Sequence, residues 1–344
     1  MMKKVTIYLL GVVSFLIAAS CAKEATTGAN DANKRYLEAW VSVNKDKYPN
    51  ITKTGLGIYV IDEKKGNGGK EVKDEGFVFV DYTITNLNGD ISSYTTYEVA
   101  KQMGTDSPTT YYGPKVWLTN DGSIFAGLQN AIVGMQVGDY KKVVIPSWLM
   151  SYNSYDTEAE YLKTSTDYAD AIYEFTVRDF TDSINVWQVD TIQRYIAKNY
   201  GTVEAFKSDT VGFYYKSLVA PVSDKEFPAD TTIYINYTGK LLNGLVFDTT
   251  SEIVAKNNNI PTDNRTFGPV SIKWGSSYTD ITMGSSGTSV IDGFARTLWQ
   301  MKAMEKGIGI FYSPFGYGYN GSEPSIPPYA PLIFEIEIVE KPEE

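Results

Sequence analysis

The chain reads YTGKLLNGLVFDTT from residue 237 to residue 250, and this stretch decides the fold of its second half. Asn243-Gly244 separates two apolar runs, which predicts a β-hairpin because both central residues of a two-residue turn must accept positive φ. Just beyond the turn, Phe247 is followed at once by Asp248. Neighbouring residues of a strand point to opposite faces, so we expect one of this pair to face the core and the other to face away.

The composition limits the chemistry that this stretch can serve. The chain has 344 residues, enough for two domains of ordinary size, and its formal net charge of −10 argues against a nucleic-acid partner. It contains no histidine and a single cysteine, Cys21. These counts exclude Ser-His-Asp catalysis, histidine-ligated zinc and an intrachain disulfide. Any chemistry must therefore use carboxylates, hydroxyls, backbone amides or the shape of a site.

The first residues predict export and a lipid anchor. Residues 1–20 combine a positive MMKK with an apolar run and a small-residue ending, which resembles a bacterial lipoprotein signal peptide that leaves Cys21 lipidated. Residues 21–34 are small and polar, so we expect a flexible tether. A short transmembrane anchor is the alternative, although the apolar run falls short of a span of about 20 residues. We expect a protein of the cell envelope, anchored at the outer membrane, with its body in the periplasm or at the cell surface.

A repeat organises the rest of the chain. The matching residues are Tyr82-Thr83 with Tyr237-Thr238, Asn88-Gly89 with Asn243-Gly244, Ala100-Lys101 with Ala255-Lys256 and Gly113-Pro114 with Gly268-Pro269, all at an offset of 155, then Gly127 with Gly293 and Met135 with Met301 at an offset of 166. The sequence therefore predicts a tandem duplication, with one domain over residues 35–181 and a second over residues 182–344.

Both copies predict the same series of elements. A short helix is followed by a strand, a hairpin, a variable loop, a brief second helix and an alternating closing strand such as LIFEIEIVE at residues 332–340. Because strands dominate, we expect an α+β architecture of two tandem domains, each an antiparallel sheet curled around one short helix.

The second copy resembles the FKBP-type peptidyl-prolyl cis-trans isomerases. The stretch at 237–250 is followed in order by VIDGF (290–294), SPFGYG (313–318) and SIPPYAPLIFEIEI (325–338). The resemblance spans roughly residues 212–340. It implies the family's fold, and an isomerase that needs neither a cofactor nor a metal.

The resemblance also implies the residues of the site. It places catalytic positions at Tyr237, Phe247, Asp248, Ile291 and Tyr317, and substrate-binding positions at Val290, Phe294, Ile326 and Phe334. In this pattern Phe247 is a pocket wall, and Asp248 accepts a hydrogen bond from Tyr237 and faces the carbonyl of the twisting bond. The Ile291 N–H and the Tyr317 hydroxyl hold the substrate backbone. The alternative for Asp248 is that it merely starts an Asx-type turn.

Two departures from the family pattern lead to further expectations. Met304 stands where the family carries a glycine after the helix, so we expect the turn to shift to Gly307. The insertion over residues 251–289 crosses the region that overhangs the pocket in the family, and we expect it to restrict access or to grip a particular client.

The first copy keeps the signals of the fold and loses those of the site. Ser92 and Ser93 stand where the second copy has Phe247 and Asp248. We therefore expect a degenerate FKBP-like domain that serves as a spacer, a client-binding surface or a dimerisation unit. The alternative is a divergent active isomerase.

The expected function is cis-trans isomerisation of X-Pro bonds in unfolded or folding envelope proteins, with the activity in the second domain. The main alternative is a non-catalytic FKBP-like chaperone or a peptide- or protein-binding lipoprotein that uses the same pocket without turnover. The 26 tyrosines and 6 tryptophans also allow surface carbohydrate capture, and the many acids leave carboxylate-pair hydrolysis open.

Overall fold

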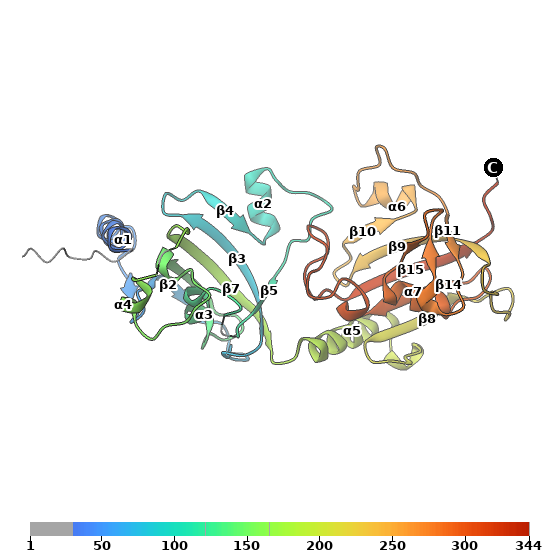
Figure 1. Ribbon diagram of the computed structural model, residues 1–344, viewed down its shortest axis with the longest axis horizontal. Coiled ribbons are helices and arrows are strands. Elements are labelled where there is room, and N and C mark those ends of the chain that lie inside the picture. Colours follow the sequence, from blue (N-terminus) through green and yellow to red (C-terminus); the bar gives the residue numbers. More distant parts are fainter. Residues whose placement is uncertain (1–29, 121, 165, 344) are drawn as a thin grey trace, which may run out of the picture.

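The computed structural model describes residues 30–343 except 121 and 165. Each half of the chain forms an antiparallel sheet with helices against it, and the two halves lie side by side along the long axis of the molecule (Figure 1). This confirms the expected α+β class. The signal peptide expected over residues 1–20 and the lipidated Cys21 lie outside the described residues.

The first sheet is built from strands between residues 52 and 181. Its strand order is β1-β2-β6-β7-β3-β4, and β5 also pairs with β3. The elements are α1 (Asp31–Val43), β1 (Thr52–Lys53), β2 (Tyr59–Lys64), β3 (Phe77–Asn86), β4 (Ile91–Tyr94), α2 (Tyr97–Met103), β5 (Lys115–Leu118), α3 (Ala126–Ile132), β6 (Tyr140–Ile145), the 3-10 turn η1 (Ser147–Leu149), α4 (Glu158–Tyr161) and β7 (Ala171–Thr181).

The second sheet has the order β13-β12-β11-β9-β15-β14-β8, and β10 also pairs with β9. Its elements are α5 (Ile184–Tyr200), η2 (Val203–Ala205), β8 (Phe213–Val219), β9 (Thr232–Leu241), β10 (Val246–Thr249), α6 (Glu252–Asn257), β11 (Val270–Lys273), η3 (Tyr278–Asp280), β12 (Thr282–Met283), β13 (Thr288–Ser289), α7 (Asp292–Trp299), β14 (Lys306–Phe311), η4 (Ser313–Phe315) and β15 (Leu332–Val339).

Two helices cover opposite faces of the second sheet. Ile192 and Ile196 of α5 pack in one apolar cluster with Ile333, while Phe294 of α7 packs in another with Phe334. Ile333 and Phe334 are neighbours in β15, so their side chains point to opposite faces of the sheet. The linker helix α5 therefore belongs to the second domain and closes the face that α7 leaves open.

The same hydrogen bonds recur in both halves at the offsets found in the sequence. The pairs, with the donor first, are Tyr82 N–H to Thr95 Oγ1 and Tyr237 N–H to Thr250 Oγ1 (both 2.9 Å), Gly113 N–H to Thr95 O (2.8 Å) and Gly268 N–H to Thr250 O (2.9 Å), and Met135 N–H to Ile132 O (3.1 Å) and Met301 N–H to Leu298 O (2.8 Å). One backbone design thus serves both sheets.

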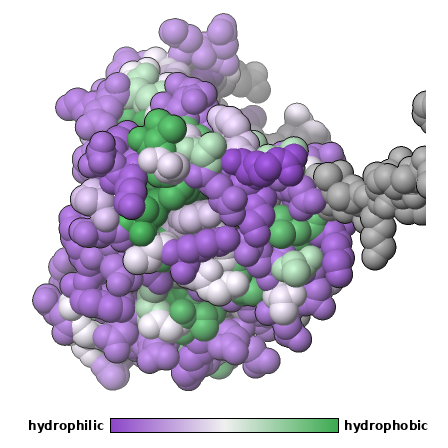
Figure 2. Space-filling model, turned by 90° about the vertical axis from the view of Figure 1, so that its left-hand side faces the viewer, coloured by the Kyte–Doolittle hydropathy of each residue, from purple (hydrophilic) through white to green (hydrophobic). Residues whose placement is uncertain are grey.

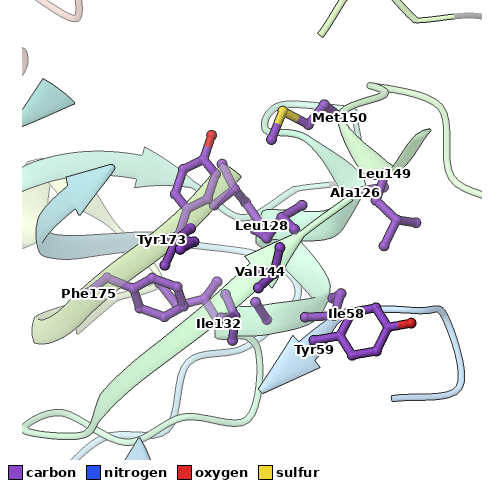
Figure 3. Close-up of a cluster of buried hydrophobic side chains, with 14 of the residues drawn as sticks. Ile58, Tyr59, Ala126, Leu128, Ile132, Val144, Leu149, Met150, Tyr173 and Phe175 are labelled. Atoms are coloured by element: carbon purple, nitrogen blue, oxygen red, sulfur yellow. The ribbon is translucent and has the colours of Figure 1, made fainter. Parts of the chain in front are cut away.

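Each short central helix approaches its sheet closely through a glycine. A Cβ at Gly127 of α3 would lie 2.5 Å from Ile145, and a Cβ at Gly293 of α7 would lie 2.3 Å from the Phe311 ring. Such distances exclude any side chain in a close-packed interior. Figure 3 shows the resulting contact in the first domain, where Leu128 and Ile132 lie against the side chains of the sheet.

The tether expected over residues 21–34 is wrong at its C-terminal end. Helix α1 begins at Asp31, and Asn30 before it is 2% exposed. The Asn30 side-chain amide donates a hydrogen bond to the Thr164 carbonyl, which ties the start of α1 to the body of the first domain. Small polar residues indicated flexibility, but this distant polar contact fixes the chain earlier.

Two turn predictions are also corrected. In the β9–β10 hairpin only Gly244 takes a positive φ, at 94°, and its N–H donates to the Leu241 carbonyl, so Asn243-Gly244 is not a turn with two left-handed residues. After α7 the turn does not shift to Gly307, which lies inside β14. Met304 itself adopts a left-handed φ of 59°.

The described helices and the outer surface add two facts. No helix in residues 30–343, positions 121 and 165 aside, is long and apolar enough to cross a membrane. Figure 2 views the end of the molecule formed by the first domain, where hydrophobic residues occur as separate patches among hydrophilic ones.

Candidate active site

Tyr237 of β9 and Asp248 of β10 meet across the hairpin. The Tyr237 hydroxyl donates a hydrogen bond of 2.6 Å to Oδ2 of Asp248. The ladder shifts register between Val246 and Asp248, so Phe247 lies in a bulge. Strict alternation across this pair is therefore a wrong expectation: Phe247 contacts the ring of Phe334, and Asp248 contacts Tyr237 beside it. The bulge brings both side chains to one site.

Arg265 completes this polar group, and the sequence did not indicate it. Its guanidinium binds Oδ1 of Asp248 and also donates to the Thr249 carbonyl at 3.1 Å. Both oxygens of Asp248 are therefore held by other side chains, which leaves no support for the Asx-type turn. Arg265 comes from the inserted stretch between α6 and β11, where no periodic pattern could have marked it.

Four aromatic rings form the floor and wall next to these polar groups. Tyr237 meets Phe294 edge to face at 5.5 Å, and Phe294 meets Phe334 edge to face at 5.1 Å between centroids. Phe247 meets Phe334 edge to face at 5.6 Å. Phe294 and Phe334 are 3% and 5% exposed, so both rings are buried. Edge-to-face pairs are the orientation that the ring quadrupoles favour, and we call these four rings the aromatic cup.

Gly239 gives the wall its place. A Cβ at this position would lie 2.5 Å from the Phe247 ring and 2.9 Å from the Phe334 ring. The backbone of Gly239 is extended, so the glycine is needed for space and not for an unusual φ. The YTG triplet of the sequence thus has a steric reason: its third residue makes room for Phe247.

The start of α7 lies at the same site. Ile291 caps the helix and is half-buried, as is Val290 before it, and both pack against the apolar core of the domain. Within the described residues the Ile291 N–H has no backbone acceptor, while its carbonyl accepts from Phe294 at 3.1 Å. Ile326, in the segment that precedes β15, is 4% exposed and packs in the same core.

Two tyrosine hydroxyls at the site stay neutral in the physiological range. Burial first, and then the hydrogen bond to Asp248, raises the pKa of Tyr237 well above its ordinary value. Burial and the charge of Asp248 also raise the pKa of Tyr317, whose side chain is 38% exposed. The Tyr237 hydroxyl therefore keeps its proton in the bond to Asp248, and the Tyr317 hydroxyl keeps a proton that it can donate. The site thus places the Tyr317 hydroxyl and the Asp248–Arg265 ion pair beside a cluster of aromatic rings.

The corresponding positions of the first domain are filled differently. In the ladder Ser93 pairs with Ile84, as Asp248 pairs with Gly239. Tyr173 pairs with Ile84 on the other side, as Phe334 pairs with Gly239. The glycine of the second domain has thus become Ile84, and the acid has become Ser93. Figure 3 shows the hydroxyl of Tyr173 pointing away from Phe175, toward the end of the cluster where Met150 lies.

Comparison with known proteins places the second domain among prolyl isomerases. The family described as FKBP-type peptidyl-prolyl cis-trans isomerase matches residues 223–339. A short-type peptidyl-prolyl cis-trans isomerase of Methanocaldococcus jannaschii is 33% identical over 75 residues, which cover 22% of this chain and 47% of that protein, so the chain spans about half of its length. FK506-binding protein 1A of Emericella nidulans is 30% identical over 122 residues, which cover 35% of this chain and 91% of that protein.

Solved structures give more distant matches. The three FKBP domains of wheat FKBP73 are 17% identical, with 82% of this chain and 94% of the wheat chain covered and a TM-score of 0.28. A peptidyl-prolyl cis-trans isomerase from Pseudomonas syringae is 22% identical, with 46% and 97% covered and a TM-score of 0.32.

Proposed function

The chain belongs to the FKBP-type peptidyl-prolyl cis-trans isomerase family, and we propose that it isomerises X-Pro bonds in the cup of its second domain. The observation that carries the proposal is the convergence of Tyr237, Phe247 and Asp248 on one aromatic floor. The first domain has neither the wall nor the acid, which supports placing the activity in the second alone.

The chemistry requires only shape and fixed donors. Rotation about an X-Pro bond is slow because it sacrifices amide resonance, with a barrier of roughly 18–20 kcal/mol. The twisted amide has a less polar carbonyl than the planar one. Transfer from water into a water-free aromatic cup therefore costs the twisted amide less than it costs the planar amide. Such a preference for the transition state over the ground state accelerates the reaction. Each tenfold gain in rate corresponds to about 1.4 kcal/mol of this difference.

The polar groups would hold the substrate backbone while the bond twists. We place the proline ring over Phe294 and Phe334, with Phe247 as the wall. The Ile291 N–H and the Tyr317 hydroxyl would donate to the flanking carbonyls and keep the turn that the twisted bond needs. Arg265 and Tyr237 would hold Asp248 facing the carbonyl of the twisting X-Pro amide. None of these three groups would then need to reorient during the reaction.

The test measures the cis-trans relaxation of a short peptide with an apolar residue before proline, with the full chain as catalyst. We expect the parent to accelerate the relaxation. The acceleration should fall about tenfold in Asp248→Asn and by a smaller factor in Tyr317→Phe, since each substitution removes a polar contact to the transition state. Asp230→Asn is the matched control, because Asp230 is an exposed acid of the same domain paired with Lys273 at the surface.

The outcomes separate catalysis from binding. A folded parent that gives no acceleration overturns the isomerase and leaves the non-catalytic chaperone, which suppression of aggregation of an unfolded protein would then measure. An equal loss in Asp230→Asn would show that the effect of Asp248→Asn is not specific to the site.

We also propose that the protein is exported and anchored by a lipid on Cys21, with unfolded or folding envelope proteins as its clients. The support is the sequence of residues 1–21 alone. Cell fractionation with metabolic labelling by a fatty-acid analogue tests it: the parent should be labelled and sediment with membranes, and Cys21→Ser should be unlabelled. A labelled Cys21→Ser protein, or an unlabelled parent, contradicts the anchor.

A further inference from the structure

One loop of the second domain carries two residues of the site and also reaches the first domain. We name residues 316–331, between η4 and β15, the rim loop; it contains Tyr317 and Ile326. Its tip is a narrow turn in which Ser322 and Ile326 exchange backbone hydrogen bonds of 2.7 and 2.9 Å. Any force on this tip therefore acts directly on Ile326, which closes it.

The tip is held by a segment of the first domain. We name residues 109–115, which lead into β5, the clamp segment; in Figure 1 it descends beside the rim loop at the centre of the molecule. The Tyr111 N–H donates to the Pro324 carbonyl at 2.8 Å. The Ser325 hydroxyl donates to the Thr109 carbonyl at 2.6 Å, and Lys115 forms an ion pair with Glu323.

Two aromatic contacts extend this attachment. The ring of Phe77 meets that of Tyr329 in the rim loop edge to face at 5.5 Å. The side chain of Tyr111 packs against the core of the second domain, and burial, followed by the charges of Asp81 and Glu323, raises its pKa to about 12. A side chain of the first domain thus forms part of the apolar surroundings of the second.

Away from the rim loop, the domains meet at Trp187 of α5. Its ring stacks on that of Phe79 at 4.2 Å, and its N–H donates to Oδ2 of Asp179 at 2.8 Å. A cavity of about 380 Å³ remains between the domains, with Val116 on one side, Trp187 of the linker helix, and Leu241 and Pro328 on the other. Within the described residues, the hydrogen bonds that join the rim loop to the first domain all lie at its tip. Single substitutions in those bonds should therefore have a measurable effect.

We propose that the clamp segment of the first domain positions the rim of the prolyl-isomerase site in the second domain. This inference rests on the proposed function. Thr109, Tyr111 and Lys115 act as positioning residues, since their hydrogen bonds and ion pair are made to the rim loop. The clamp holds Tyr317 and Ile326 ready for the X-Pro segment, so the domain without a complete cup still takes part in the reaction.

The test uses the full chain with the charge at the junction reversed and then restored. Lys115→Glu repels Glu323, while the double variant Lys115→Glu, Glu323→Lys restores the pair in the opposite sense. We expect KM for the X-Pro peptide to rise about 3–10-fold in Lys115→Glu with kcat changed less than about twofold, because the clamp affects the readiness to bind. The swapped variant should recover most of the parental KM.

Hydrogen–deuterium exchange of the rim loop provides the readout that does not depend on activity. Exchange at residues 318–330 should rise in Lys115→Glu and return in the swapped variant. Lys142→Glu is the matched control, because Lys142 forms a similarly exposed ion pair with Glu174 within the first sheet. Its KM and its rim-loop exchange should equal those of the parent.

Each outcome decides the inference. Unchanged KM and exchange in Lys115→Glu overturn it, and so does an equal change in Lys142→Glu or a failure of the swap to restore either quantity in a folded protein. If the parent itself proves inactive, the proposed function fails alone, and the exchange measurement then decides whether the clamp positions the loop.

Discussion

The two domains share a scaffold and differ in the pocket. The hydrogen bond from the backbone N–H of Tyr82 to Thr95 has its counterpart at Tyr237 and Thr250, with the same length of 2.9 Å. Where the second domain has Gly239, Phe247 and Asp248, the first has Ile84, Ser92 and Ser93. The backbone design therefore tolerates complete replacement of the site.

The replacements are coupled through space. In the second domain Gly239 leaves room for the ring of Phe247. In the first domain the sizes are reversed. The large side chain is Ile84 on β3, at the position of Gly239, and the small one is Ser92 on β4, at the position of Phe247. A side chain on one strand excludes a side chain on the other, so loss of the wall and loss of the glycine belong together. A single reversal in the first domain would leave either a clash or a hole.

The largest effect is expected when the second domain receives the serines of the first. The double variant Phe247→Ser, Asp248→Ser removes the wall and the acid, and we expect catalysis by the full chain to fall at least about 100-fold, because no second cup replaces the lost one. Ser92→Ala with Ser93→Ala should leave the rate unchanged. Peptide isomerisation by the first variant at more than a tenth of the parental rate would show that the first domain is itself active.

A smaller but still large effect is expected from Gly239→Ala. The new Cβ would contact the rings of Phe247 and Phe334 at 2.5 and 2.9 Å. Overpacking of this kind costs about 1–3 kcal/mol, and displacement of the wall should lower the isomerisation rate about tenfold. Urea unfolding and peptide kinetics measure both. Lys273→Ala in β11, whose ion pair with Asp230 is exposed, should change neither by much.

These comparisons mark what the sequence could predict. The order of motifs from residue 237 to residue 338 predicted the α+β class, and the repeat offsets matched bonds that recur in both sheets. Short motifs carry such information because a turn or a strand is a local choice. Arg265, the bulge at Phe247 and the clamp segment were not predictable, since each depends on where a distant part of the chain comes to lie.

Alkaline pH should destabilise the parent more than the variant Tyr173→Phe. In this variant one position of the first domain carries the residue of the second domain. Tyr173 stands where the second domain has Phe334, and burial, followed by nearby tyrosines, raises its pKa to about 12. The neutral hydroxyl is favoured in the folded state, so its contribution is fully present below the unfolded pKa of about 10 and is lost as the pH rises toward 12.

The measurement is the free energy of unfolding in urea at pH 8 and pH 11. Between these values Tyr173→Phe should lose about 1.4 kcal/mol less than the parent, because the variant has no hydroxyl to ionise at this position. Tyr319→Phe is the control, since Tyr319 is 70% exposed. An identical pH dependence of parent and Tyr173→Phe would contradict the prediction.

The smallest effect concerns the turn after the central helix, where the first domain has Gly138 at φ 95° and the second has Met304 at φ 59°. A left-handed conformation costs a residue with a Cβ about 1–2 kcal/mol, while glycine has a larger entropy in the unfolded chain that offsets roughly half of this. Met304→Gly should therefore stabilise the protein by about 0.5–1 kcal/mol, and Gly138→Met should destabilise it by a similar amount. Urea unfolding of both variants measures the pair. Because the two changes exchange one residue between equivalent turns, opposite signs are required; a loss of stability in both would mean that Met304, although 38% exposed, is held by its side chain and not merely tolerated by its backbone.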